Sequence, residues 1–363
     1  MIVIYTIKEY LQYYKKTSIR EVHWNAIDNM LCALLVYLPV DAFTGSKGIR
    51  ELYDYAMKYI NDGKESMLVP MAYEVLELAY DCGRYKNLKV YNWEIIKTEQ
   101  IQFGAATFRI GSETIVAYKG TDYSLIGWIE NIRLGYEYPT KTHVKAMEYL
   151  KNNIRILGDK NLYIVGHSKG GNLAMVSAME AGDRIWNRIR KVYNFDGPGF
   201  RKEEFESAKY KKLSTKLVSI LPSGSIVGAL LYNENYTVVK SSGIAVEEHI
   251  LTRWNLFGEH FIEAKLSSVS LRLHEATTKG IECLSCEVTR EAFESLFENL
   301  EKDLTEDISM SIEDVIKLIK NMKNINPEVK GCVENIIETL VKVNINGEKK
   351  TFKLPWRKKN DTI

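Results

Sequence analysis

The feature that most constrains the fold is a short apolar strand followed by a glycine-flanked serine and a helix of small residues. The stretch reads Asn161-Leu-Tyr-Ile-Val-Gly-His-Ser-Lys-Gly-Gly-Asn-Leu-Ala174, in which Gly166, Ser168 and Gly170 form a G-x-S-x-G pattern. This pattern between a strand and a helix is typical of a nucleophile elbow, a strained turn that exposes a serine above an α/β sheet. A Cβ at either glycine would clash with neighbouring elements on such a turn. The pattern predicts an α/β fold with Ser168 as its nucleophile.

Strands and helices alternate around this turn. We expect strands over 90–96, 101–110, 114–118, 162–165, 191–195, 216–221 and 236–239, and helices over 125–134, 143–156, 170–181 and 261–273. Such alternation is typical of a mostly parallel sheet with helices on both faces. We therefore predict a doubly wound α/β domain of the α/β-hydrolase fold.

The 363 residues divide by pattern into three parts. Residues 1–82 predict an α-rich lead-in packed on the core, with helices over 25–38, 49–60 and 66–80. Residues 83–275 form the predicted α/β-hydrolase core. Residues 276–363 predict a C-terminal appendage of charged amphipathic helices and a hairpin around Asn346-Gly347. We interpret the two outer parts as packing decoration rather than as a lid.

Composition excludes several classes of protein. A net charge of +2 from 49 basic and 47 acidic residues is too balanced for a nucleic-acid-binding footprint. The N-terminus lacks the pattern of a secretory signal peptide, and no apolar run is long enough for a transmembrane segment. Five cysteines, of which only Cys283 and Cys286 are close in sequence, argue against a disulfide framework and a zinc site. We expect a cytoplasmic protein that needs no metal or cofactor.

A nucleophilic serine needs a general base, which in this fold is a histidine after the last strand. His249 follows the predicted final strand, 236–239, and is our candidate. His260 and His274 flank or lie on a predicted helix, so we assign them structural roles. The same assignment covers the histidines that precede Ser168 in the chain, which are His23, His143 and His167.

The acid that orients this base is the weakest point of the pattern. Strand 216–221, where the acid is expected, is followed by Pro222-Ser-Gly-Ser-Ile-Val-Gly228, which has no carboxylate. Asp196, at the end of strand 191–195, is our candidate, although it equally suits a cap of the turn at Gly197 and Pro198. Glu247 and Glu248 are weaker candidates, and a dyad in which Ser225 or a backbone carbonyl holds the imidazole remains open.

Two backbone N–H groups are candidates for stabilising an oxyanion. The N–H of Lys169 lies at the start of the helix after Ser168, where N–H groups have no intrahelical partner. The N–H of Thr121, in Lys119-Gly-Thr-Asp122 after strand 114–118, is the second candidate. The alternative for this loop is an ordinary glycine turn with Asp122 as a helix cap.

Together these residues resemble a little-characterised bacterial α/β-hydrolase family that is distantly similar to the class 3, fungal-type lipases. The resemblance rests on the Ser168 stretch, His249 with Trp254, and the motifs Lys119-Gly-Thr-Asp122, Trp128-Ile-Glu-Asn131, Phe195-Asp-Gly-Pro-Gly-Phe200 and Ser225-Ile-Val-Gly228. It implies an oxyanion role for Thr121. It also implies that the stretch 223–228 normally carries the catalytic aspartate, where this chain has a serine.

We therefore predict a serine hydrolase of the esterase or lipase-like kind that cleaves a small-molecule or lipid ester through an acyl-enzyme on Ser168. Two alternatives remain. The same serine could serve an acyltransferase or a thioesterase, or the chain could be a non-catalytic binding protein that kept the fold and lost the acid.

Overall fold

The structure is a computed structural model that describes residues 5–59, 68–98, 101–121, 127, 130–131, 133–243, 245–272, 274–275, 278 and 290. Half of the predicted helix over 125–134 lies outside the described residues. Asp122, the Cys283 and Cys286 pair and the hairpin at Asn346 lie wholly outside them, as do the C-terminal helices apart from residue 290. Within the described residues, no helix is long and apolar enough to cross a membrane.

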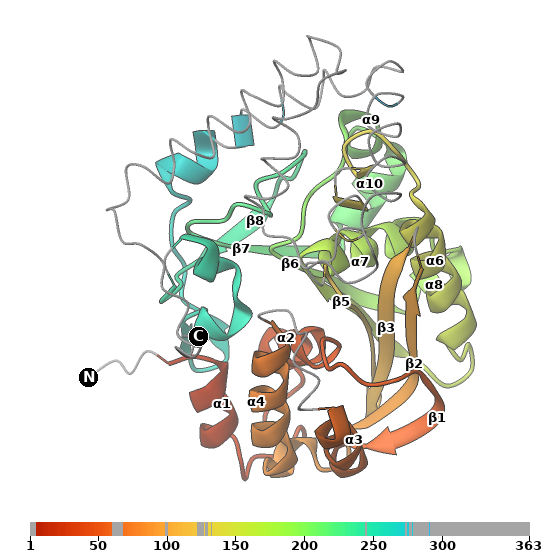
Figure 1. Cartoon of the computed structure of the whole chain (residues 1–363), viewed down its shortest axis with the longest axis vertical. Helices are drawn as coiled ribbons and strands as arrows, with labels where there is room; N and C mark the ends of the chain where they lie inside the picture. Colours follow the sequence, from red (N-terminus) through yellow and green to blue (C-terminus); the bar gives the residue numbers. More distant parts are fainter. Residues whose placement is uncertain are drawn as a thin grey trace, which may run out of the picture.

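Eight strands of the described chain form one twisted sheet in which spatial order follows chain order (Figure 1). Neighbours from β1 to β4 pair antiparallel, and neighbours from β4 to β8 pair parallel. The strands are β1 (Phe43–Gly48), β2 (Lys89–Lys97), β3 (Gln102–Ile110), β4 (Glu113–Tyr118), β5 (Asn161–His167), β6 (Ile189–Phe195), β7 (Leu217–Pro222) and β8 (Tyr236–Val239). A separate hairpin joins β9 (Leu256–Phe257) to β10 (His260–Phe261).

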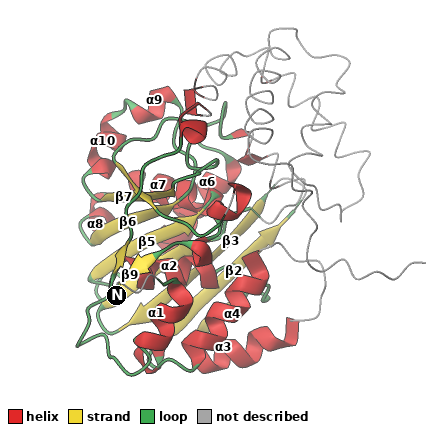
Figure 2. Cartoon of the chain, turned by 90° about the vertical axis from the view of Figure 1, so that its left-hand side faces the viewer, coloured by secondary structure: helices red, strands yellow, loops and turns green. Residues whose placement is uncertain are grey.

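Helices cover both faces of the sheet, as Figures 1 and 2 show. Side chains of β4 alternate between two buried clusters: Ile115 and Ala117 face one, and Val116 and Tyr118 face the other. The first cluster is closed by α1 (Ile7–Tyr13), α2 (Ala26–Leu35), α3 (Ile49–Ala56) and α4 (Leu68–Tyr80). The second is closed by α6 (Lys141–Asn153), α7 (Lys169–Met179), α8 (Asp183–Trp186) and α10 (Ala208–Ser214), with α9 (Lys202–Phe205) beside α10. The predicted α/β-hydrolase fold, with its mostly parallel sheet and helices on both faces, is confirmed.

In the doubly wound sheet that we predicted, crossover helices cover both faces. In the described part of this structure they cover only one face. Strands β4 to β8 follow one another without a reversal of order, and right-handed crossovers between strands in such an order all pass over the same face. The crossover helices α6, α7 and α10 accordingly share one cluster. The opposite face is covered by the N-terminal helices instead.

The α-rich lead-in also contributes the edge strand β1, which was not predicted and whose sequence Phe-Thr-Gly-Ser-Lys-Gly contains no buried residue. One predicted helix is shorter than expected. The helix expected over 261–273 begins at 268. Residues 261–267 are not helical, because their backbone is paired elsewhere. The Ile262 N–H donates to Asn255 O, the Lys240 N–H donates to Ile262 O, and Glu263 forms a β-bridge with Val239.

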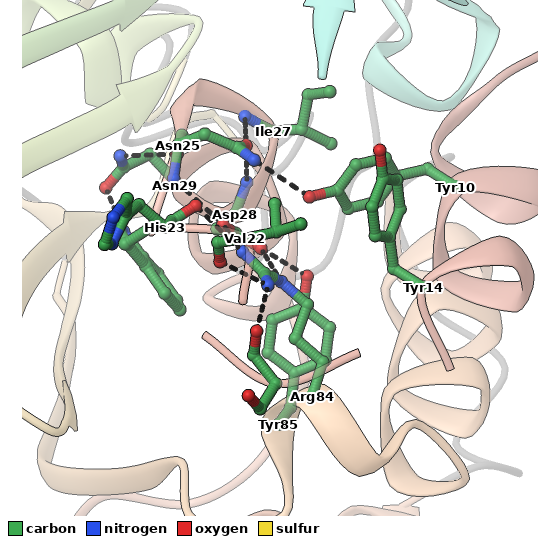
Figure 3. A network of polar contacts seen from close by, with 12 residues as sticks. Tyr10, Tyr14, Val22, His23, Asn25, Ile27, Asp28, Asn29, Arg84 and Tyr85 are labelled. Atoms are coloured by element: carbon green, nitrogen blue, oxygen red, sulfur yellow. Dashed lines mark hydrogen bonds and ion pairs between the residues drawn. The ribbon is translucent and has the colours of Figure 1, made fainter. Parts of the chain in front are cut away.

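A buried polar network joins the helices of the lead-in, and Figure 3 shows it from close by. Asp28, in the first turn of α2, accepts hydrogen bonds from Arg84 Nε and Nη2 at 2.9 and 2.6 Å and from the Tyr85 hydroxyl at 2.6 Å. Arg84 also donates to the carbonyls of Val22 and His23. The charged heads of Asp28 and Arg84 are fully buried. Since each charge is paired and hydrogen-bonded, the network tolerates burial.

Candidate active site

Ser168 lies on a strained turn between β5 and α7. Its backbone has φ of 58° and ψ of −135°, a left-handed conformation that side-chain-bearing residues rarely adopt. The turn is packed too closely for side chains at its flanks: a Cβ at Gly166 would lie 2.0 Å from Gly170 O, and one at Gly170 would lie 2.2 Å from Tyr118 O. The serine itself is 8% exposed.

His249 and Asp196 contact each other although 53 residues separate them. Asp196 follows β6, and His249 ends the 3₁₀ helix η3 (Ala245–His249). His249 Nδ1 lies 2.6 Å from Asp196 Oδ2. The other oxygen, Oδ1, accepts hydrogen bonds from Ser225 Oγ and, at 3.1 Å, from Gly228 N. Both oxygens of this fully buried carboxyl therefore have hydrogen-bond donors, which offset the cost of burying a carboxylate.

The pairing orients the imidazole. An ionised carboxylate only accepts hydrogen bonds, so Nδ1 carries the proton and Nε2 of the neutral ring is left as a base. The ring of His249 packs against that of His167, the residue before Ser168, with centroids 4.3 Å apart. The imidazole of His249 is therefore held beside the serine turn.

Two of the alternative partners of the imidazole, Glu248 and Ser225, make other contacts. Glu248 accepts hydrogen bonds from Ser223 Oγ and Gly224 N, both at 2.7 Å. Ser225 contacts Asp196 rather than the imidazole. Ser225 stands where the class 3 resemblance expects an aspartate, and here it serves the carboxylate from the neighbouring strand.

The turn after β4 lies against the serine. A Cβ on Gly120 would be 3.1 Å from Ser168 Cβ. The next residue, Thr121, is half-buried, and its hydroxyl lies 3.0 and 3.2 Å from the two side-chain polar atoms of Asn131. Lys169 is the first residue of α7, so its N–H is one of those that have no partner within the helix. The two predicted oxyanion donors thus flank the serine on adjacent segments.

The Lys169 side chain forms a buried ion pair that the sequence did not reveal. Its Nζ contacts Glu130 Oε2 at 2.5 Å and Gln102 O and Oε1 at 2.9 and 2.8 Å. Lysine and glutamate side chains are 1% and 5% exposed. Burial raises the pKa of Glu130, while the charge of Lys169 acts in the opposite direction. The pair ties α7 to the segment that carries Asn131, and hence to Thr121.

A second buried network holds the loop that follows Asp196. His143 Nδ1 accepts from the Thr140 N–H, so its Nε2 donates to Asn172 Oδ1 at 2.7 Å. Asn172 then donates to the carbonyls of Pro198 and Gly199. Burial lowers the pKa of His143 to about 4, which keeps it neutral. Asn172 lies in the stretch around Ser168, but nothing in its local sequence indicates this long-range contact.

The remaining histidines lie away from Ser168. His260 lies exposed in β10, His274 Nδ1 contacts the carbonyl of Ala229 at 2.9 Å, and His23 is exposed in the lead-in. Within the described residues, no three His, Cys, Asp or Glu side chains are grouped so that they could hold a metal ion.

Comparisons with known proteins connect the chain to one family. The family profile described as Mbeg1-like matches residues 80–298, more than half of the chain. No curated protein is detectably similar to it.

Among solved structures, a lipase of Rhizomucor miehei in complex with its propeptide is similar with 16% identity and a TM-score of 0.33, over 44% of this chain and 58% of that chain. The M37 lipase is similar with 15% identity and a TM-score of 0.32, over 57% of this chain and 70% of that chain. The chain thus matches less than two thirds of the Rhizomucor miehei lipase chain.

Proposed function

The chain belongs to the Mbeg1-like family, and from the side chains gathered around Ser168 we propose that it is a serine hydrolase that cleaves a carboxylic ester through an acyl-enzyme. The family relationship expected from the motifs is confirmed by this match. The observation that carries the proposal is the 2.6 Å contact between His249 Nδ1 and Asp196 Oδ2 beside a strained, glycine-flanked serine. A base that is oriented by a buried carboxylate is what a serine nucleophile requires.

In the proposed mechanism, Ser168 Oγ attacks the ester carbonyl while His249 Nε2 takes the hydroxyl proton. Asp196 stabilises the imidazolium that forms, and the N–H groups of Thr121 and Lys169 receive the negative charge of the tetrahedral intermediate. His249 then returns the proton to the departing alcohol. Water repeats the sequence on the acyl-enzyme and releases the acid, and the reaction needs no cofactor.

The contacts of Asp196 favour this reading over a non-catalytic binding protein. That alternative draws its support from the missing aspartate at Ser225. Asp196 contacts the imidazole of His249, and Ser225 contacts Asp196. We therefore interpret the missing aspartate at position 225 as replaced by Asp196 from the neighbouring strand. A binding protein has no need of a strained serine at φ of 58°.

The test combines covalent labelling with turnover. We expect a fluorophosphonate probe to label the wild type and not Ser168→Ala, and p-nitrophenyl esters to be hydrolysed by the wild type but not by Ser168→Ala or His249→Ala. Probe labelling that persists in Ser168→Ala would overturn the assignment. Equal turnover in all three proteins would do the same.

Transfer to an alcohol or amine instead of water uses the same acyl-enzyme. Product analysis with competing nucleophiles separates hydrolysis from acyl transfer. A cytoplasmic location is also part of the proposal, because the buried free thiols of Cys32 and Cys82 suit a reducing compartment.

A further inference from the structure

A continuous chain of hydrogen bonds joins the turn at Gly120 to His249. It passes through two side chains, those of Tyr37 in the lead-in and of His167, the residue before Ser168. Tyr37, just after α2, is fully buried, as is His167. The Tyr37 hydroxyl lies 3.1 Å from Gly120 N and 3.0 Å from His167 Nδ1. His167 Nε2 lies 2.8 Å from the carbonyl oxygen of His249.

The donors and acceptors in this chain fix its direction. A carbonyl oxygen only accepts, so His167 Nε2 carries a proton and donates it to His249 O. In the neutral ring, Nδ1 is then an acceptor, and the Tyr37 hydroxyl donates to it; the same hydroxyl also lies 3.3 Å from the His167 carbonyl. The hydroxyl in turn accepts from the Gly120 N–H. Burial lowers the pKa of His167 well below its ordinary value, and the nearby His249 acts in the same direction.

Packing leaves little freedom along this path. A Cβ on Gly120 would lie 2.1 Å from the Tyr37 hydroxyl and 2.7 Å from His167 O. A glycine at 120 is therefore what allows the hydroxyl to reach the backbone next to Thr121. At the other end, the ring of His167 packs on that of His249, so His249 is held through both its backbone carbonyl and its ring.

We propose that Tyr37 and His167 are positioning residues that set the mutual placement of the general base His249 and the oxyanion turn at Gly120 and Thr121. The inference rests on the proposed function of Ser168. It gives the lead-in a part in catalysis that differs from the packing role expected from the sequence. It also gives His167 a second role beside the structural one.

The first test removes one oxygen atom. Since displacement of a catalytic group by about 1 Å can cost roughly 100-fold in rate, we expect Tyr37→Phe to lower kcat on a p-nitrophenyl ester by about 10- to 100-fold and to leave KM within about threefold. Tyr85→Phe is the matched control, because it also removes a fully buried tyrosine hydroxyl, which lies 2.6 Å from Asp28 of the lead-in. We expect it to keep the wild-type kcat. A wild-type kcat in Tyr37→Phe, or an equal loss in both variants, would overturn the proposal.

The second test separates hydrogen bonding from ring packing. His167→Phe keeps an aromatic ring against His249 but removes both hydrogen bonds, whereas His167→Gln keeps an N–H that can reach the His249 carbonyl. We expect kcat in the glutamine variant to exceed that in the phenylalanine variant by about tenfold, the scale of one neutral hydrogen bond. Equal kcat values in the two variants would contradict a positioning role for the hydrogen bond.

The third test does not depend on turnover. We expect ¹⁵N-histidine NMR of the wild type to show His167 as the neutral tautomer protonated on Nε2, and Tyr37→Phe to shift the ring resonances of both His167 and His249. Tyr85→Phe should leave both unchanged. Protonation of His167 on Nδ1, or His249 resonances that stay in place in Tyr37→Phe, would refute the inference. Absence of labelling and turnover in the wild type would instead refute the proposed function, and the NMR result would still decide the positioning of His249.

Discussion

At the scale of single residues, the candidate site is organised around the carboxylate of Asp196. This residue follows β6, whereas the acid was expected after the next strand, β7. Ser225 and Gly228, which follow β7, donate to Asp196 Oδ1. The carboxyl ends of adjacent parallel strands meet at one edge of the sheet. A carboxylate from either strand can thus reach the same imidazole, and the neighbouring loop is free to supply donors.

The first prediction concerns this carboxylate. We expect Asp196→Asn to lower kcat by up to about 10⁴-fold with a small change in KM, because an amide that donates to Nδ1 favours the tautomer with its proton on Nε2. Steady-state kinetics on a p-nitrophenyl ester measures the loss. Glu248→Gln is the control, since Glu248 binds Ser223 and Gly224 instead. If the glutamine variant lost as much activity as the asparagine variant, Asp196 would not be the acid.

The sequence predicts Ser168 more firmly than its partners for a physical reason. The serine turn is a local structure whose glycines, strand and helix all lie within one short stretch. The acid depends on which loop reaches His249 across the sheet. The sequence therefore left several partners of the imidazole open, namely Asp196, Glu247, Glu248, Ser225 and a backbone carbonyl. Tyr37 has no local signal at all, because its contact with His167 spans 130 residues.

At the scale of elements, the buried pair of Lys169 and Glu130 couples the start of α7 to the segment that carries Asn131. Breaking a buried pair leaves an uncompensated charge, whereas replacing both members with apolar residues avoids that penalty. The pair is therefore more informative as a double-mutant cycle than as a single substitution.

The second prediction uses that cycle. We expect Lys169→Met and Glu130→Met each to lower the free energy of unfolding by about 3–5 kcal/mol, and the double variant to lose less than either. Urea denaturation of the four proteins measures these values. Losses in the double variant equal to the sum of the single losses would show that the two side chains act independently.

The third prediction concerns the network in Figure 3. Asp28→Asn leaves the buried guanidinium of Arg84 without its counter-charge, and we expect the free energy of unfolding to fall by about 3–5 kcal/mol. Chemical denaturation measures it. Glu74→Gln, which removes one member of an exposed ion pair with Lys8 on the same lead-in, serves as the control and should cost less than about 1 kcal/mol. Similar losses in both variants would contradict a special role for the buried pair.

Elements that are buried along most of their length are among those that the sequence predicts well. Five of the seven residues of β5 and all residues of α7 are buried, and Lys169 is the single Lys, Arg, Asp or Glu residue of these two elements. Strand β1 escapes prediction because it is an exposed edge of polar residues. Its conformation depends on pairing with β2, which local sequence does not encode. The helix predicted over 261–267 is absent for the same reason, since the conformation of this segment depends on backbone hydrogen bonds of Ile262 with Asn255 and Lys240.

At the scale of the whole molecule, the lead-in and the core share one buried cluster. Side chains of α1 to α4 belong to the same cluster as residues of β2 to β8, and α2 contacts β4, β5 and β6. We propose that residues 1–82 and 83–275 fold as one unit, although their sequence patterns differ.

The fourth prediction tests this unity. We expect one cooperative transition in urea, with the same midpoint by far-ultraviolet circular dichroism and by the fluorescence of the buried Trp93 and Trp254. Two separated midpoints would instead indicate two independent units.

The fifth prediction is a dependence of stability on pH. His143 has a folded pKa of about 4 against an ordinary value of 6.5, so between these values the unfolded chain binds more protons than the folded one. The free energy of unfolding therefore decreases as pH falls from about 6.5 to about 4, by up to about 3 kcal/mol from this group. His167, whose pKa is also lowered by burial, adds to the effect, and Glu130, whose pKa burial raises, opposes it.

Comparison with His143→Gln isolates the contribution of His143. Denaturation curves at several pH values should show a smaller loss of stability on acidification in the glutamine variant, which keeps a donor for Asn172. The same pH slope in both proteins would show that folding does not lower the pKa of His143.

The N-terminal position of the helices that close one face of the sheet has a consequence for biosynthesis. During translation α1 to α4 leave the ribosome before most of the strands of the sheet have been made. The contacts that complete the site join Tyr37 to His167 and Asp196 to His249 over 130 and 53 residues. Contacts of such long range slow folding. A nascent chain that has not reached His249 lacks the proposed base, and so we expect ester hydrolysis to begin only after synthesis has passed the last parallel strand, β8.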